Sequence, residues 1–248
     1  MAMKPVDRLL ATARAEIGYI EKETNAHLDD KTANAGDGNW NKYARDLDAL
    51  GVVYNGKKNG YAWCDIFTDW CFIQTFGLEL GLQLLCQAKK GVGAGCSGSA
   101  NYYKQKGQFH TSGPQPGDQI FFTKDGGKSF YHTGIVEKVA GGRVYTIEGN
   151  TSSAAGVVEN GGCVRDKSYP LTYSKIAAMA APIFPLYRRR TTIWIKPSSM
   201  RCSPLRWRST ESSSVTTTAA TGARRPESGP CPWAYSRATA PWTTGSRT

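Results

Sequence analysis

Apolar residues near the start of the chain recur at spacings of three and four, the period of one helix face. They predict an amphipathic helix within residues 4–20, and segment 39–50 predicts a second, shorter helix. The run IFTDWCFIQTFGLELGLQLL at 66–85 is strongly apolar and long enough for a buried helix. We therefore expect the first part of the chain to be helical. The apolar positions of the first helix are Val6, Leu9, Leu10, Ala13, Ile17 and Ile20.

Three segments further along have the length and the turn boundaries of strands. They are DQIFFTK at 118–124, HTGIVEKVA at 132–140 and RVYTIEG at 143–149. Gly141-Gly142 lies between the last two as a hairpin turn. With 248 residues, of which 40% are hydrophobic, the chain can bury one sizeable core or two small ones. Helices first and antiparallel strands later predict an α+β fold.

The character of the chain changes from about residue 178. Residues 188–248 contain 21 Ser or Thr, four Trp, ten Arg and no Asp, without a helical or a strand period. They carry 11 Lys and Arg against 2 Asp and Glu, whereas residues 1–187 carry 20 against 18. We therefore divide the chain into a nearly neutral folded domain at 1–187 and a basic Ser/Thr/Arg-rich tail at 188–248.

Two explanations of this tail are open. It is expected to be disordered, although four Trp are unusual in a solvated segment. Alternatively, it is a translation displaced by one base. Codons for residues 177–182 can be written so that the shifted frame reads Gly-Tyr-Gly-Arg-Pro, a turn-like sequence, and shifting Trp194-Ile195 restores an acidic residue. On this hypothesis the residues from 178 onward carry no selected function.

The sequence predicts neither a membrane span nor a secretion signal. No stretch reaches 18 uninterrupted apolar residues, and the first twenty residues lack an apolar h-region. Its seven cysteines are irregularly spaced and form no CxxC pair, unlike a disulfide scaffold or a zinc site. We expect reduced thiols in a cytoplasmic product.

Candidate chemistry begins at Cys64, between a turn and the start of the apolar run. Amide groups at a helix N-terminus favour a thiolate, the nucleophilic form of cysteine, although a buried structural cysteine is the common alternative. His132, at the head of a predicted strand, can act as the base. Glu148 follows 16 residues later across the hairpin and can orient the imidazole. Asn150, two residues on and expected on the same face, is a second candidate for that role.

Five motifs occur in the order GNWNKYARDL, NGYAWCDIFTDWCF, PQPGDQIFF, HTGIVEKV and YTIEGNTS. Together, from about residue 5 to 177, they resemble the cysteine, histidine-dependent amidohydrolase/peptidase (CHAP) domain of peptidoglycan hydrolases, common in bacteriophage endolysins. The resemblance implies a papain-like cysteine peptidase fold, with N-terminal helices packed on an antiparallel sheet. It also implies a closing turn like Gly-Tyr-Gly-Arg-Pro, which the displaced frame would supply.

The resemblance implies Cys64 as nucleophile, His132 as general base and acid, and Glu148 as orienter, with Asn150 nearby. The thiolate would attack an amide carbonyl, His132 would protonate the departing amine, and water would cleave the thioester. The backbone N–H of Cys64 would help to stabilise the oxyanion. The bond cut is either the N-acetylmuramoyl-L-alanine amide or one in the stem peptide or crossbridge.

Several residues near these motifs have two interpretations. Asp65 either caps the helix, which we favour, or contacts substrate. Nearby aromatic residues either line a substrate groove or belong to the core. Cys71 is expected in the core, and His27 and His110 on the surface. The aromatic groove candidates are Trp40, Tyr61, Trp63 and Tyr131.

The polar loop at 24–40 offers Asp29, Asp30 and Asp37 as oxygen ligands, but without the spacing of an EF-hand. A solvated loop is the favoured interpretation. Because some CHAP domains bind calcium before the nucleophile helix, the resemblance keeps a Ca²⁺ site open. The implied mechanism itself requires no cofactor.

We expect a monomer that acts on bacterial peptidoglycan and binds no nucleic acid, since the folded part is nearly neutral. Without a secretion signal, it is expected to accumulate in the cytoplasm of the producing bacterium and to reach the wall after release. The alternatives are a catalytically inactive prophage remnant and a non-catalytic module that binds an anionic wall polymer through the basic tail.

Overall fold

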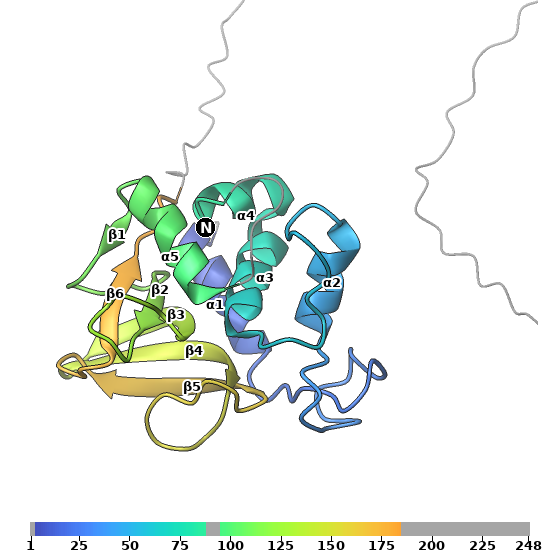
Figure 1. Ribbon diagram of the computed structural model, residues 1–248. Helices are drawn as coiled ribbons and strands as arrows, with labels where there is room; N and C mark the ends of the chain where they lie inside the picture. Colours follow the sequence, from blue (N-terminus) through green and yellow to red (C-terminus); the bar gives the residue numbers. More distant parts are fainter. Residues whose placement is uncertain (1–2, 88–94, 185–248) are drawn as a thin grey trace, which may run out of the picture. The chain divides into compact units, whose positions relative to one another are not determined.

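The computed structural model describes residues 3–87 and 95–184 of the chain (Figure 1). The tail at 188–248 lies outside these residues, and the two explanations of its composition concern residues outside the described ranges. Helices precede strands, as the sequence predicts. The helices are α1 (Pro5–Ala15), α2 (Lys42–Leu50), α3 (Cys64–Phe76), α4 (Leu78–Leu84) and α5 (Cys96–Gln105), and the strands are β1 (Phe109–His110), β2 (Gln119–Phe122), β3 (His132–Ala140), β4 (Arg143–Thr151), β5 (Cys163–Pro170) and β6 (Ile176–Ala180).

The six strands form one antiparallel sheet in the order β1-β6-β2-β3-β4-β5. The α+β fold predicted from the sequence is therefore confirmed. β3 and β4 form the expected hairpin, with Ala140 paired to Arg143 across the turn. β6 is the last strand of the described residues and yet lies between β1 and β2, where Met179 is opposite Ile120.

α3 occupies the middle of the helical layer, which covers one side of the sheet (Figure 1). It contacts α1, α2 and α4 as well as β3 and β4, and 11 of its 13 residues are buried. Burial on every side explains why this part of the sequence is apolar without a polar face. The apolar run at 66–85 does not form one helix, because α3 ends at Phe76 and the next residue, Gly77, has a φ of 81° that is unfavourable for other residues.

The sheet is buried on both faces. Ile135 and Ile147 point into the main helical core, and side chains from the other face form a second cluster. A third cluster lies where the start of α3 meets α5 and β2, and it includes Cys64 and Phe121. The second cluster contains Ile120, Phe122, Val136, Val144, Tyr169 and Met179.

Residues 178–184 take part in the fold. Ala178, Met179 and Ala180 are buried in β6. The Phe184 ring stacks on Phe72, with centroids 6.4 Å apart. The sequence is thus used structurally through Phe184, including positions that the displaced-frame hypothesis assigns to the shifted frame. In the described ranges, no helix combines the length and apolarity that a membrane crossing needs.

Candidate active site

Cys64 is the first residue of α3, as its place between turn and apolar run predicts. Its N-cap neighbour Trp63 supplies no side-chain hydrogen bond to the helix start. The amide groups of the first turn therefore lack a side-chain cap and favour negative charge at the Cys64 sulfur. Cys64 is buried, with 6% of its surface exposed.

His132 and Glu148 lie side by side on β3 and β4. Nε2 of His132 is 2.9 Å from Oε2 of Glu148, and both side chains are fully buried. The same carboxylate accepts hydrogen bonds from the Thr146 hydroxyl at 2.6 Å and the Tyr169 hydroxyl at 3.0 Å. Its orientation is therefore fixed by three neighbours. Nδ1 of His132 is buried without a hydrogen-bond partner, so it is the ring nitrogen left for Cys64.

Gly134 makes room for this pair. A Cβ atom at this position would lie 2.5 Å from Cγ of Glu148. No real side chain fits at that distance, so glycine lets the Glu148 side chain cross β3 toward His132. A second close approach occurs at Gly149, where a Cβ would lie 2.4 Å from Cβ of Phe67 in α3.

Asn150 is not the partner of His132. The pairing of β4 with β5 shifts register between Glu148 and Thr151, and Asn150 has a φ of 53°. Asn150 therefore lies at an irregularity of β4, where the regular alternation of faces cannot be assumed. The Asn150 side-chain oxygen instead accepts a hydrogen bond from the backbone N–H of Gly162 at 3.2 Å.

The electrostatics of the site favour a thiolate–imidazolium pair. A hydrogen bond from Cys96 outweighs burial and, together with the contact to His132, holds the pKa of Cys64 well below its ordinary value. Burial lowers the pKa of His132, but interactions with Cys64 and Glu148 prevail and raise it to about 10. Both shifts favour the charged form of each group.

Asp65 has neither of its expected roles. Its two carboxylate oxygens accept hydrogen bonds from Ser99 Oγ at 2.7 Å and from Gln119 Nε2 at 3.1 Å. Gln119 Nε2 also donates to Thr133 Oγ1 at 3.1 Å. Asp65 is buried, so it faces the interior rather than the helix start or a substrate. Burial also raises the pKa of its carboxyl group well above the ordinary value.

The aromatic groove candidates separate into different environments. Trp63 is a core residue and not part of a groove, since it is fully buried and its Nε1 donates to Glu21 at 2.7 Å. Tyr61 is 65% exposed and borders an open cavity of about 440 Å³ that includes Ile66 and Tyr102. Tyr61 is thus the candidate whose exposure suits substrate contact.

Trp40 and Tyr131 are half-buried. The Trp40 ring approaches the backbone at Gly60, where a Cβ would lie 3.7 Å from it. Tyr131 packs against the cluster on the far face of the sheet, and the Lys124 ammonium lies 4.4 Å from its ring centroid. Both have internal contacts that explain their positions.

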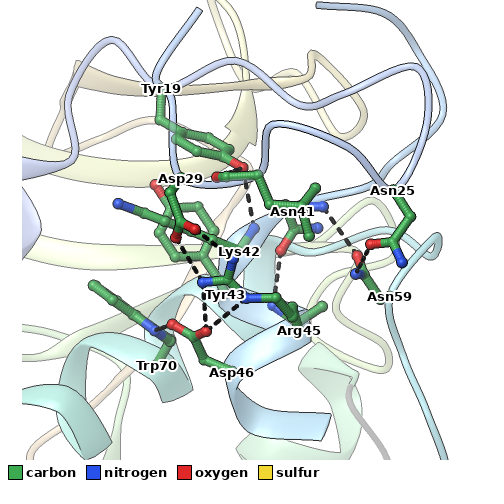
Figure 2. Close-up of polar contacts among 12 residues, drawn as sticks. Tyr19, Asn25, Asp29, Asn41, Lys42, Tyr43, Arg45, Asp46, Asn59 and Trp70 are labelled. Carbon is green, nitrogen blue, oxygen red and sulfur yellow. Dashed lines mark hydrogen bonds and ion pairs between the residues drawn. The ribbon is translucent and has the colours of Figure 1, made fainter. Parts of the chain in front are cut away.

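The loop carboxylates do not fit a calcium site. Figure 2 shows Arg45 directed at both Asp29 and Asp46, and its nearest contact to Asp29 is 2.7 Å. Asp30 accepts hydrogen bonds from two backbone amides of its own loop. The backbone N–H of Asp37 donates to Glu23. In residues 3–87 and 95–184, no three His, Cys, Asp or Glu side chains converge in a way that could hold a metal ion. A cation at Asp29 would have to compete with the Arg45 guanidinium.

The remaining titratable candidates lie away from the site. His27 is exposed and Cys71 is buried in the core, as expected. His110 is half-buried and lies 3.3 Å from Asp118, an acidic partner that the sequence did not indicate.

Sequence reasoning also missed Cys96, whose sulfur is 3.6 Å from that of Cys64. No periodicity or motif linked Cys96 to Cys64, because their contact joins α3 to α5, which are separated along the chain by α4.

Residues 56–150 match the CHAP domain family, and this segment contains Cys64, His132 and Glu148. CHAP domains have a papain-like fold, in agreement with the α+β architecture. No protein with a curated description matches the chain.

Among solved structures, the chain is similar to "The crystal structure of Ly7917", with 16% identity, 71% of this chain and 62% of that chain covered, and a TM-score of 0.40. It is also similar to "The crystal structure of Ly7917 with the hydrolyzing product of MDP", with 18% identity, the same coverage and a TM-score of 0.37. Both alignments span less than two thirds of the other chain. The similarity to the CHAP domain rests on the match of residues 56–150, the segment that carries the three candidate catalytic side chains.

Proposed function

We propose that the chain is a cysteine-dependent peptidoglycan hydrolase that cuts an amide bond of the bacterial cell wall. The observation that carries this proposal is the hydrogen bond between His132 and Glu148 at 2.9 Å, beside a cysteine at a helix start. The match of residues 56–150 to the CHAP domain supports the choice of substrate class.

In the first half of the proposed reaction, the Cys64 thiolate attacks the carbonyl carbon of the amide. The developing oxyanion is stabilised by the backbone N–H of Cys64, which points from the start of α3 without a side-chain cap. The His132 imidazolium then gives its proton to the nitrogen as the C–N bond breaks. An amine leaves, and the acyl group remains on sulfur as a thioester.

In the second half, neutral His132 removes a proton from water, and the resulting hydroxide attacks the thioester. The C–S bond breaks, a carboxylic acid leaves, and the Cys64 thiolate and His132 imidazolium are restored. Glu148 accepts the Nε2 hydrogen bond throughout, which keeps Nδ1 directed to the reaction. No step uses a metal or another cofactor.

Two finer assignments belong to this proposal. The scissile bond is either the N-acetylmuramoyl-L-alanine amide or a bond of the stem peptide or crossbridge, and Tyr61 beside its open cavity is proposed to contact the substrate. The biological role proposed is that of a bacteriophage lysin, a monomer that reaches the wall after release from the producing cell.

The test is mass spectrometry of soluble fragments released from purified Gram-positive peptidoglycan by the full chain and by Cys64→Ala. We expect fragments with new amine ends from the unaltered chain alone, and the residues at those ends identify the bond. A folded chain that releases no fragments would instead be an inactive remnant or a wall-binding module. Fragments that persist in Cys64→Ala would remove the nucleophile assignment.

A further inference from the structure

Cys96, the first residue of α5, brings a second thiol to the candidate nucleophile. Its Sγ lies 3.6 Å from Sγ of Cys64, within hydrogen-bond distance for a pair of sulfur atoms. Both cysteines are buried and neither forms a disulfide. The reaction proposed above gives Cys96 no role, so the contact needs its own explanation.

The first turn of α5 is fixed from two sides. The Ser99 hydroxyl donates to Asp65 of α3 at 2.7 Å. The Ser97 hydroxyl accepts a hydrogen bond at 2.9 Å from the backbone N–H of Phe130, just before β3. The position of Cys96 is therefore set by the same elements that carry Cys64 and His132.

The surroundings give the two thiols different protonation states. Cys64 faces the Cys96 sulfur, His132 and the backbone N–H of Asp65, all of which favour its thiolate. Cys96 faces the Cys64 sulfur and the Asp65 carboxyl group; its bond to Cys64, together with burial, raises the pKa of Cys96 well above the ordinary value. Since two adjacent thiolates would repel each other, Cys96 keeps its proton and is the donor.

We propose that Cys96 is a positioning residue whose S–H donates a hydrogen bond to the Cys64 thiolate and holds this sulfur at the start of α3 beside His132. The inference rests on the proposed role of Cys64 as nucleophile. A donor to the charged form favours ionisation, so Cys96 lowers the pH at which Cys64 becomes reactive. A packing role alone would be filled equally well by an apolar side chain.

The test follows alkylation of Cys64 by iodoacetamide against pH in the full chain, read by peptide mass spectrometry without peptidoglycan. We expect Cys96→Ala to raise the midpoint by about one pH unit, which slows labelling about tenfold below the midpoint. Cys96→Ser keeps a donor and should stay near the unaltered chain. The matched control is Cys71→Ala, which removes another buried thiol of α3 and should leave the midpoint unchanged.

An unchanged midpoint in Cys96→Ala overturns the proposal, and so does an equal shift in the alanine, serine and Cys71→Ala variants. If the alanine variant does not fold by near-ultraviolet circular dichroism, Cys96→Val replaces it, since valine fills the space without donating, and an unshifted midpoint there also overturns the proposal. If the midpoint shifts in Cys96→Ala but the unaltered chain does not hydrolyse peptidoglycan, only the proposed function is contradicted. If the unaltered chain hydrolyses peptidoglycan but the midpoint does not shift in Cys96→Ala, only the role of Cys96 is contradicted.

Discussion

Glu148 opposes the effect of burial on the pKa of His132. Taken alone, the buried position of His132 would favour a neutral imidazole, yet the carboxylate and the Cys64 sulfur raise its pKa to about 10. With that pKa, His132 is protonated at neutral pH and loses its proton as the pH rises through about 10. The leaving amine can therefore be protonated over the whole neutral range.

Replacing Glu148 by Gln should move the alkaline limit of the reaction. Glu148→Gln removes the negative charge but retains an acceptor for Nε2, so the pKa of His132 should fall by roughly one unit or more. We expect the alkaline limb of the kcat/KM profile to shift to lower pH by that amount and kcat/KM to drop by about 100-fold. The measurement is the pH profile of peptidoglycan clearing. Glu159→Gln, at a half-exposed position, is the control and should keep the original limb; a limb unmoved in Glu148→Gln would contradict the coupling.

Site residues can be predicted from the sequence where their positions are set by the residues next to them in the chain. Cys64 was predicted from a helix start, and His132 with Glu148 from the spacing of a hairpin, because both are set by contiguous sequence. Asp65 was misassigned for the opposite reason. Its partners Ser99 and Gln119 lie on other elements, and no local pattern relates them to the start of α3.

At the scale of elements, a buried polar bridge ties the nucleophile helix to the base strand. Asp65 follows Cys64, Thr133 follows His132, and the Gln119 amide from β2 donates to both at 3.1 Å. Each partner is buried, so losing the donor leaves polar groups unsatisfied. The bridge therefore fixes how α3 meets β3.

Removing this bridge should reduce catalysis more than a substitution elsewhere that destabilises the fold by the same amount. Gln119→Met is expected to lower the free energy of unfolding by about 1–3 kcal/mol and to reduce kcat with little change in KM. Gln87→Met is the matched control, because Gln87 donates at 2.8 Å to Asp69, one turn further along α3. It should cost similar stability and leave kcat near that of the unaltered chain. Urea unfolding and steady-state kinetics check both, and an equal loss of kcat in the two variants would contradict a specific bridge.

The elements that escaped sequence reasoning share weak local signals. β6 reads IAAMA, in which alanine is a poor strand former, and α5 reads CSGSANYYKQ, with glycine and serine that favour neither state. β5 reads CVRDKSYP, in which a run of consecutive polar residues interrupts any strand period. Each is stabilised by tertiary contacts: β6 pairs with two strands, and α5 is anchored by Ser99.

At the scale of the molecule, the sheet depends on a strand near the end of the described chain. β6 hydrogen-bonds to β1 and β2 and buries Ala178, Met179 and Ala180. Phe184 adds a ring contact with the helical layer. The domain therefore needs the chain through Phe184.

Truncation after β6 and truncation before β6 should have opposite effects on folding. A chain that ends at residue 187 should unfold cooperatively with a Tm within a few degrees of the full chain and retain hydrolysis. A chain that ends at residue 175 lacks β6 and should show no cooperative transition, because two strands lose their hydrogen-bonding neighbour. Calorimetry and wall clearing measure both. Loss of all wall binding and clearing at 187 would point instead to a tail-driven binder.

The place of β6 also governs when the molecule can form during synthesis. The strand that joins β1 to β2 leaves the ribosome after every other strand of the sheet. Until it arrives, one edge of β2 is open, and the apolar run Ile120–Phe122 is available to other nascent chains. Completion of the sheet is thus a late event of translation, and a polysome that stalls before residue 176 would display an aggregation-prone edge.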